Sequence, residues 1–219
     1  FNELDGMSDC GEGGENVRRN RGGDLENDRS KVRQFASARF AADAPYIMNA
    51  DEIEIKISQG VKPREGGHLR KHLVTAEIAA LRHTKEGVDL ISPPPHHDVY
   101  SIEDLALLIE NIRAVNPNVK ISVKIASSVD CGVVVVGTAK AGADTVCVSG
   151  AEGGTQAAFS SSREHTGLPL EIGLADIHQA LTQNGMRDFI GIRADGGIKT
   201  GEDFVKLVLM GADEIALGT

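Results

Sequence analysis

Residues 189–219 constrain the fold most, because they hold two short apolar segments that each end in a glycine turn. The first apolar segment lies at 189–192 and the second at 214–217, and an apolar helical face at 204–209 separates them. The order strand, glycine turn, helix, strand, glycine turn is typical of the end of a (β/α)8 barrel. The loops after the last two strands of such a barrel commonly bind phosphate.

The two glycine turns are therefore the first candidate binding site. The turn after the first segment contains Gly196 and Gly197, and the chain ends with Gly218 and Thr219. Glycine adopts positive φ without steric cost and lets backbone N–H groups approach an anion closely. We expect these four residues to hold a phosphate group, and two ordinary turns are the alternative.

An internal repeat supports a parallel sheet. Residues 139–150 and 208–219 share a helix end, Gly-Ala-Asp and a short strand, and 86–93 is a weaker third copy. Repeated helix-to-strand units with short connections produce parallel strands. We expect an α/β fold with about six strands, fewer than the eight of a closed barrel. The prediction is a single-domain (β/α)8 TIM barrel over 1–219, incomplete at its N-terminal strands and after its last strand, as in a fragment; a doubly wound sheet is the alternative.

Hydrophobic periodicity places the elements before this repeat. Isoleucines alternate with charged residues over 52–57, and apolar runs at 88–91 and 121–126 also predict strands. A helix is expected over 32–43. Lys124 lies inside an apolar strand, where an unused charge is costly to bury, so we expect it to point into the site.

Composition excludes several classes of function. The net charge is −9 and no basic stripe is present, so nucleic-acid binding is not expected. No apolar run approaches the roughly 18 residues of a membrane span. Cys10, Cys131 and Cys147 have no C-x-x-C spacing, which indicates a reducing, cytoplasmic setting and no metal cluster within the chain. The His96-His97 pair favours structural hydrogen bonding over a metal site, since consecutive residues rarely point at one ion.

Several motifs, in order, resemble the FMN-binding synthase domain of glutamate synthase. They are GEGGE (11–15), VRQFASARF (32–40), EIKISQGVKPREGGHL (54–69), LRHTKEGVDLISPPPHHDVYSIEDLA (81–106), ISVKIAS (121–127), GGT (153–155), ADGGIKTG (194–201) and ALGT (216–219). The resemblance implies a (β/α)8 barrel holding FMN. It implies an oxidoreductase acting on CH–NH2 donors that condenses 2-oxoglutarate with ammonia and reduces 2-iminoglutarate to L-glutamate with FMNH2.

The resemblance assigns substrate roles to five residues. Lys62 and Arg82 would bind the carboxylates of 2-oxoglutarate, which suits a point charge and a bidentate fork. His68 stands where the family has a glutamine and would contact the substrate. Glu12 or Glu15 would hold ammonium and take its proton.

The resemblance also assigns the cofactor site. Lys124 would lie beside the N1 and C2-carbonyl edge of the flavin and stabilise the anionic reduced ring. Gln34 would hydrogen-bond to the ring. The remaining cofactor residues lie in glycine turns: Gly153, Gly154, Asp195, Gly196, Gly197, Gly218 and Thr219.

The sequence departs from the family's pattern in the loops. Gln156 replaces a glycine, Asp130 adds a charge, and Arg64, Arg70 and Lys71 enter the loop that contains Lys62. The family's glutaminase domain, iron–sulfur cysteine cluster and electron donor, a reductase subunit or ferredoxin, have no counterpart in these residues. The chain alone is therefore expected to be inactive. The alternatives are a phosphate-binding barrel of the IMP dehydrogenase type, for which Cys131 is a poor match, and a non-catalytic barrel remnant.

Overall fold

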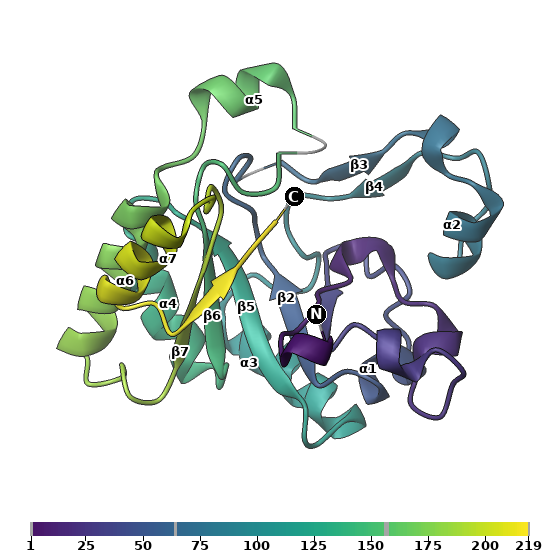
Figure 1. Cartoon of the computed structure of the whole chain (residues 1–219), viewed down its shortest axis with the longest axis horizontal. Coiled ribbons are helices and arrows are strands. Elements are labelled where there is room, and N and C mark those ends of the chain that lie inside the picture. Colours follow the sequence, from purple (N-terminus) through teal and green to yellow (C-terminus); the bar gives the residue numbers. More distant parts are fainter. Residues whose placement is uncertain (1, 64, 156–157, 219) are drawn as a thin grey trace.

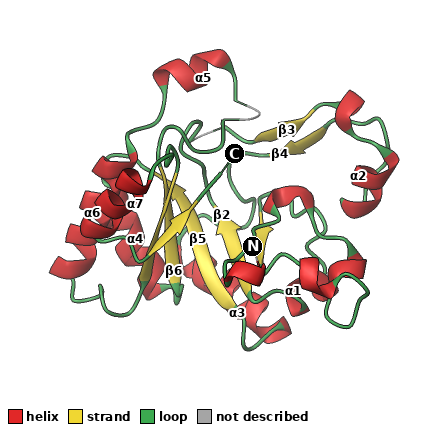
Figure 2. Ribbon diagram, in the orientation of Figure 1, coloured by secondary structure: helices red, strands yellow, loops and turns green. Residues whose placement is uncertain are grey.

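A parallel β-sheet forms the centre of the molecule. The computed structural model describes residues 2–63, 65–155 and 158–218. Its six-stranded sheet has the order β1-β2-β5-β6-β7-β8, and every neighbouring pair in it is parallel (Figures 1 and 2). The strands are β1 (Val32–Phe35), β2 (Glu52–Lys56), β5 (Lys120–Ala126), β6 (Thr145–Ser149), β7 (Gly191–Asp195) and β8 (Glu214–Ala216).

Helices cover one face of this sheet, and their apolar side chains join those of the strands in one core. These helices are α1 (Ala44–Met48), α3 (Ile102–Val115), α4 (Cys131–Lys140), α6 (Leu170–Gln183) and α7 (Gly201–Leu209). A further helix, α5 (Ser160–His165), lies in the loop between β6 and α6. Among the described residues, no helix combines the length and apolar character needed to cross a membrane.

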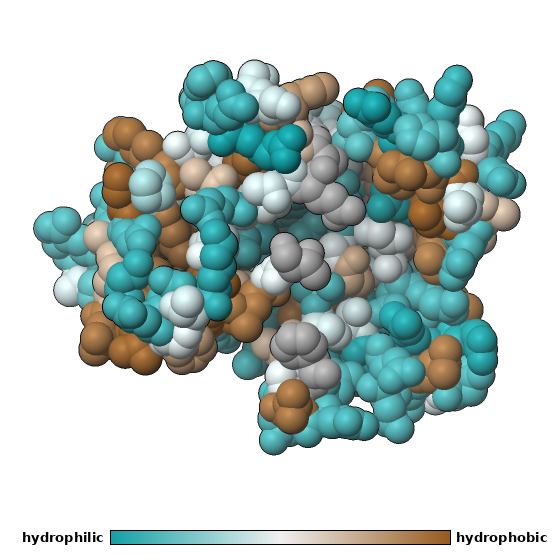
Figure 3. Space-filling model, turned by 45° about the horizontal axis from the view of Figure 1, so that its top comes forward, coloured by the Kyte–Doolittle hydropathy of each residue, from teal (hydrophilic) through white to brown (hydrophobic). Residues whose placement is uncertain are grey.

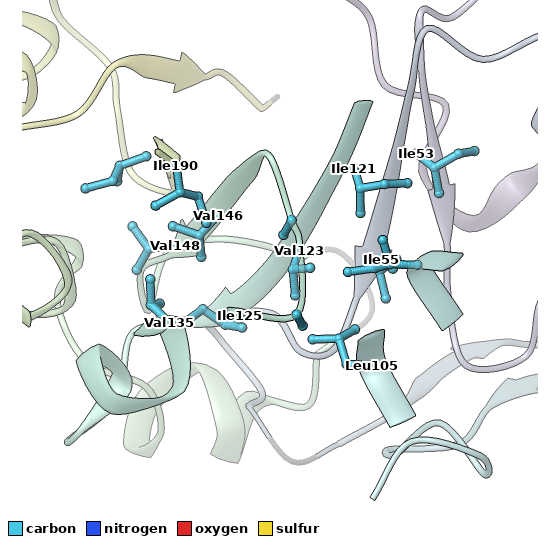
Figure 4. Packing of buried hydrophobic residues seen from close by; sticks show 14 of the residues in the cluster. Ile53, Ile55, Leu105, Ile121, Val123, Ile125, Val135, Val146, Val148 and Ile190 are labelled. Carbon is cyan, nitrogen blue, oxygen red and sulfur yellow. The ribbon is translucent and has the colours of Figure 1, made fainter. Parts of the chain in front are cut away.

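The two faces of the sheet differ because successive side chains of a strand point to opposite sides. Ile53, Val123 and Val146 point into the core beneath the helices (Figure 4). The residues between them form the opposite face, which we call the polar face. Its members are Gln34, Glu52, Glu54, Lys56, Ser122, Lys124, Ser149, Arg193 and Asp195.

Ion pairs neutralise the deepest part of the polar face. Arg193 donates to Glu52 through Nη1 at 2.6 Å and Nη2 at 2.9 Å, and through Nε to Glu214 at 2.7 Å. Ser122 Oγ donates to Glu52 at 2.5 Å. The side chains of Arg193 and Glu52 are only 8% and 3% exposed. A charge buried to this degree is tolerated only when it is paired and hydrogen-bonded, so this pair ties β2 to β7 across the sheet.

The expected helix over 32–43 is wrong, because Val32–Phe35 form β1 and are buried throughout. The sequence did not show this strand because two of its polar side chains, Arg33 and Gln34, are buried and hydrogen-bonded inside the protein. Arg33 Nη1 donates to the carbonyl oxygen of Tyr46 at 3.0 Å. Beyond the strand, Arg39 and Ala41 adopt positive φ values of 53° and 56°, which interrupts any helix there.

The expected strand at 88–91 exists but lies outside the parallel sheet. Strand β4 (Leu90–Ser92) pairs antiparallel with β3 (Gly67–Leu69). Together with α2 (Ala76–Leu81) they form a lobe, 67–92, that projects beyond the sheet in Figure 1. Its small core consists of Val74, Ala79 and Leu90. The third copy of the repeat is therefore not a barrel unit.

Helices α2 and α3 begin at the capping residues Thr75 and Ser101. Thr75 Oγ1 accepts from Ile78 N at 3.3 Å, and Ser101 with Asp104 forms a capping box. The N-terminal loop contains the 3-10 helices Asn2–Leu4, Gly11–Gly13, Val17–Arg19 and Glu26–Asp28. In the described part of the chain, β1 and β8 are the sheet's edges, so a parallel α/β sheet is confirmed and a closed barrel is not.

We expect Arg193→Met to lower the free energy of unfolding of the 219-residue chain by about 3–5 kcal/mol, because it leaves Glu52 buried without its cation. Urea denaturation followed by circular dichroism measures this. Arg113→Met is the control: its pair with Asp144, at 2.9 Å, has side chains 35% and 45% exposed, so its loss should cost about 1 kcal/mol or less. Equal losses for the two variants would contradict a structural role for the buried pair.

Candidate active site

A cavity of about 1070 Å³ opens at the carboxyl ends of β2 and β5. The N-terminal loop, the polar face and the 67–92 lobe enclose it, and Figure 3 shows the molecular surface hollowed near the centre of the view. Ligands of parallel α/β proteins bind at this end of the strands. The lining residues that carry functional groups include Glu12, Gln34, Lys56, Gln59, Lys62, His68, Arg70, Arg82, Ser92 and Lys124.

Lys124 lies in this cavity beside a carboxylate. Its Nζ is 2.7 Å from Asp195 Oδ2, which also accepts from Ser149 Oγ at 2.9 Å. Burial alone would lower the pKa of Lys124, but the negative charge of Glu54, together with Cys147 and Asp195, raises it well above its ordinary value. The sequence prediction that Lys124 reaches the site is consistent with this position, and Asp195 is its direct partner.

Gln34 reaches the same cavity from β1. Its side chain is buried, and Nε2 donates to Glu54 Oε1 at 2.8 Å. Residues 34 and 54 are register partners on neighbouring parallel strands, which places both on the polar face. The sequence analysis named Gln34 but missed Glu54, although the charge alternation over 52–57 placed Glu54 on the same face as Lys56.

The three residues predicted to bind substrate line one cavity. Lys62 is buried, and burial, followed by the charge of Lys56, lowers its pKa. The guanidinium carbon of Arg82 lies 5.2 Å from the ring centre of Phe40, and burial lowers its pKa as well. His68 Nε2 is 3.5 Å from Asp89 Oδ2, an ion pair only when the imidazole is protonated.

Arg82 can donate a further hydrogen bond to a ligand. Its Nε is buried and has no hydrogen-bond partner among the described residues. A guanidinium is a fork of donors that matches a carboxylate. Arg82 and Lys62 therefore offer two partly desolvated positive charges to an anionic ligand.

Glu12 connects the N-terminal loop to the other walls. Its Oε2 accepts from Lys56 Nζ and from Ser92 Oγ, both at 3.2 Å. A Cβ at Gly67 would come within 2.5 Å of Glu12 Oε1, so the Glu12 carboxylate lies directly against the start of β3. Lys56 was missed in the sequence analysis, although it is the register partner of Lys124.

Glu15 is not among the residues that line the cavity. Its side chain is 3% exposed and lies 3.3 Å from Arg19 Nη1. Its carboxylate accepts from the backbone N–H groups of Ser30 at 2.8 Å and Asn16 at 3.2 Å. These contacts give Glu15 a role in shaping the N-terminal loop, and leave Glu12 as the carboxylate that reaches the cavity.

The predicted glycine turns follow neighbouring strands of the sheet. Gly196 and Gly197 follow β7 with φ values of 104° and 76°, and Gly218 follows the neighbouring strand β8. A Cβ at Gly196 would approach Gly153 N to 2.9 Å, so the turn after β7 packs closely against the loop after β6.

The glycines face two cavities. Gly196 and Gly197 line a second cavity of about 320 Å³, whereas Gly154 lines the large one. Thr219, the last residue assigned to this site, lies outside the described residues.

The residues that depart from the family's pattern do not gather in one place. Arg70 lines the large cavity, whereas Asp130 is exposed at the start of α4, away from the residues lining that cavity. Lys71 contributes its backbone N–H to Asp89 at 2.5 Å. Arg64 and Gln156 fall outside the described residues. Across 2–63, 65–155 and 158–218, no cluster of three or more His, Cys, Asp or Glu could hold a metal ion.

Comparisons with known proteins identify relatives across the whole chain. A family described as the conserved region in glutamate synthase matches residues 1–219. The chain is 48% identical to the NADPH-dependent glutamate synthase large chain of Azospirillum brasilense and 49% identical to the NADH-dependent enzyme of Saccharomyces cerevisiae. It is 46% identical to the chloroplastic ferredoxin-dependent enzyme of Spinacia oleracea.

Each of these matches covers 100% of the chain but only 14%, 10% and 15% of the respective relative. Among solved structures, a double mutant of flavocytochrome b2 with pyruvate bound matches at a TM-score of 0.52 and 18% identity. That match covers 88% of this chain and 45% of the other, and it shows a shared fold. By the family match and the sequence identities, the chain belongs to the glutamate synthase family.

Proposed function

We propose that the chain is the FMN-binding synthase domain of a glutamate synthase, whose parallel strands form part of a (β/α)8 barrel. In this function it makes L-glutamate from 2-oxoglutarate and ammonia. One observation carries the proposal: a charged lysine, Lys124, opens onto the same cavity as the buried Lys62 and the half-buried Arg82. One cation suits a reduced flavin ring, and the other two suit a dicarboxylate.

The described residues fit FMN. Lys124 and Gln34, both in the large cavity, offer hydrogen-bonding groups for a flavin ring. The close-packed turn at Gly196 and Gly197 offers backbone N–H groups for a phosphate, with Gly218 just after the next strand. When bound, reduced FMN supplies the hydride for the reaction. Lys124 then holds a positive charge beside the ring and stabilises its anionic form.

The other cavity residues act on the substrates. Lys62 and Arg82 bind and orient the carboxylates of 2-oxoglutarate, and His68 lies on the adjacent β3 strand. Glu12 holds ammonium and takes up its proton, while Lys56 and Ser92 fix the carboxylate that does so.

The remaining functions belong to other parts of the enzyme. The relatives' names include NADPH-, NADH- and ferredoxin-dependent forms, and we propose an electron donor of one of these kinds, with ammonia from a glutaminase domain. The family's iron–sulfur cluster would be bound elsewhere, and the setting would be cytoplasmic. The IMP dehydrogenase alternative has no support, because Cys131 is buried beside Asp176 at 3.5 Å, outside the cavity lining.

The proposal is tested with the full-length protein. Its flavin absorption should bleach on anaerobic reduction and return when 2-oxoglutarate and ammonia are added together, but not when either is added alone. A folded protein without flavin, or a reduced flavin that these substrates leave unchanged, would overturn the assignment.

Removing the charge at position 124 should make the flavin harder to reduce. In Lys124→Met, the ratio of reduced to oxidised flavin at a fixed potential should fall about tenfold or more, a shift of ~30 mV for a two-electron couple. Redox titration of the bound flavin measures the shift. Lys120→Met on the same strand, at an exposed position, should leave the potential unchanged. A Lys124→Met potential equal to wild type would contradict the proposed contact.

Removing the guanidinium group at position 82 should weaken substrate binding. Truncating one partner of a buried charge pair costs at least ~2 kcal/mol, so Arg82→Met should raise KM for 2-oxoglutarate about 30-fold or more. Steady-state kinetics of the full-length enzyme measure this, with FMN content checked by absorbance. Lys85→Met, an exposed cation on the same lobe, is the matched control. Equal KM values for both variants would exclude Arg82 from the substrate site.

A further inference from the structure

Glu54 occupies an unusual place on the polar face. It is 2% exposed and lies at the middle of β2, in register with Gln34 on β1 and Ser122 on β5. One layer deeper, Glu52 is fully engaged by Arg193 and Ser122. The negative charge of Glu54 is less fully neutralised, because Arg193 Nη1 is 3.9 Å from its Oε2. Its short contact is the hydrogen bond from Gln34 Nε2 to Oε1, at 2.8 Å.

That hydrogen bond determines which way the Gln34 amide faces. A carboxylate only accepts hydrogen bonds, whereas an amide has a donor end and an acceptor end. Glu54 therefore fixes the NH2 group of Gln34 on its own side. The amide oxygen is the acceptor that Gln34 retains for a ligand in the cavity, which it lines.

We propose that Glu54 is a positioning residue of the flavin site, which orients the Gln34 amide so that its oxygen faces an N–H group of the flavin ring. This inference rests on the proposed function, because the ligand is FMN. Glu54 does not line the cavity among the described residues, so it acts through Gln34. A flavin ring has an N–H at its pyrimidine edge, and a correctly turned amide oxygen is the complementary group.

Glu54 also influences Lys124, but this second effect can be separated from the first. Burial lowers the pKa of Lys124, and the charge of Glu54 opposes that effect. Asp195 lies 2.7 Å from Lys124 Nζ, and among the described residues none of its hydrogen bonds involves Glu54. Lys124 therefore keeps a carboxylate partner in a Glu54 variant, and changes in FMN affinity report mainly on Gln34.

The test measures the dissociation constant of FMN from the full-length apoprotein by quenching of flavin fluorescence. Glu54→Met removes the acceptor and should weaken FMN binding about tenfold, since a hydrogen bond to a charged group contributes ~1.5 kcal/mol or more. Glu54→Gln keeps an oxygen that can accept from Gln34 and should stay within about threefold of wild type. Equal losses in the two variants would indicate a charge effect and overturn the orienting role.

A double-mutant cycle tests whether Glu54 acts through Gln34. On a Gln34→Leu background, Glu54→Met should change the dissociation constant by less than about twofold. A full tenfold loss on that background, or no loss from Glu54→Met alone, would overturn the proposal. Should Glu54→Met not fold, Glu54→Thr, whose hydroxyl is too short to reach Gln34, replaces it in the cycle.

Glu52→Met is the matched control, on the same strand and face but one layer away from the cavity. It should lower the Tm while leaving the FMN dissociation constant of the folded protein within about twofold. If wild type itself does not bind FMN, the proposed function fails. If wild type binds FMN and the Glu54 variants bind it equally well, only the inference about Glu54 fails.

Discussion

The ion pair between Arg193 and Glu52 is the constraint on which the rest of the structure depends. It closes the deep end of the polar sheet face, at distances of 2.6 and 2.9 Å. The alternation of side chains along each strand separates this face from the aliphatic core beneath the helices. The sheet can therefore carry charged residues through its middle while a single core supplies its hydrophobic stabilisation.

From that pair toward the carboxyl ends of the strands, the polar face becomes increasingly accessible to a ligand. Glu54 and Gln34 form the next layer, and Lys124 with Asp195 forms the rim at the cavity. Gln34 is hydrogen-bonded to Glu54, and Lys124 and Ser149 both contact Asp195, so the groups facing the cavity are oriented before a ligand arrives. Such preorganisation is how a protein stabilises charge that develops during a reaction. The 67–92 lobe then adds the cations that suit a dicarboxylate.

The sequence predicted the C-terminal half of the fold well, because its strands are apolar and its turns contain glycine. It failed for β1 (Val32–Phe35), where Arg33 and Gln34 are buried and bonded to distant partners that no local pattern reveals. Local pattern also could not tell that β4 pairs with β3. In the site, motif resemblance found the cations, but the separation of Glu12 from Glu15 depends on how the N-terminal loop packs.

The most direct test of this account is an experimental structure of the full-length protein with its flavin bound. The account predicts the flavin ring at the carboxyl ends of the strands, within hydrogen-bond distance of Lys124 Nζ and the Gln34 side chain, with the phosphate at the turn of Gly196 and Gly197. A flavin bound elsewhere, with the large cavity filled only by solvent, would contradict the central claim that the polar face of this sheet is built to hold the cofactor.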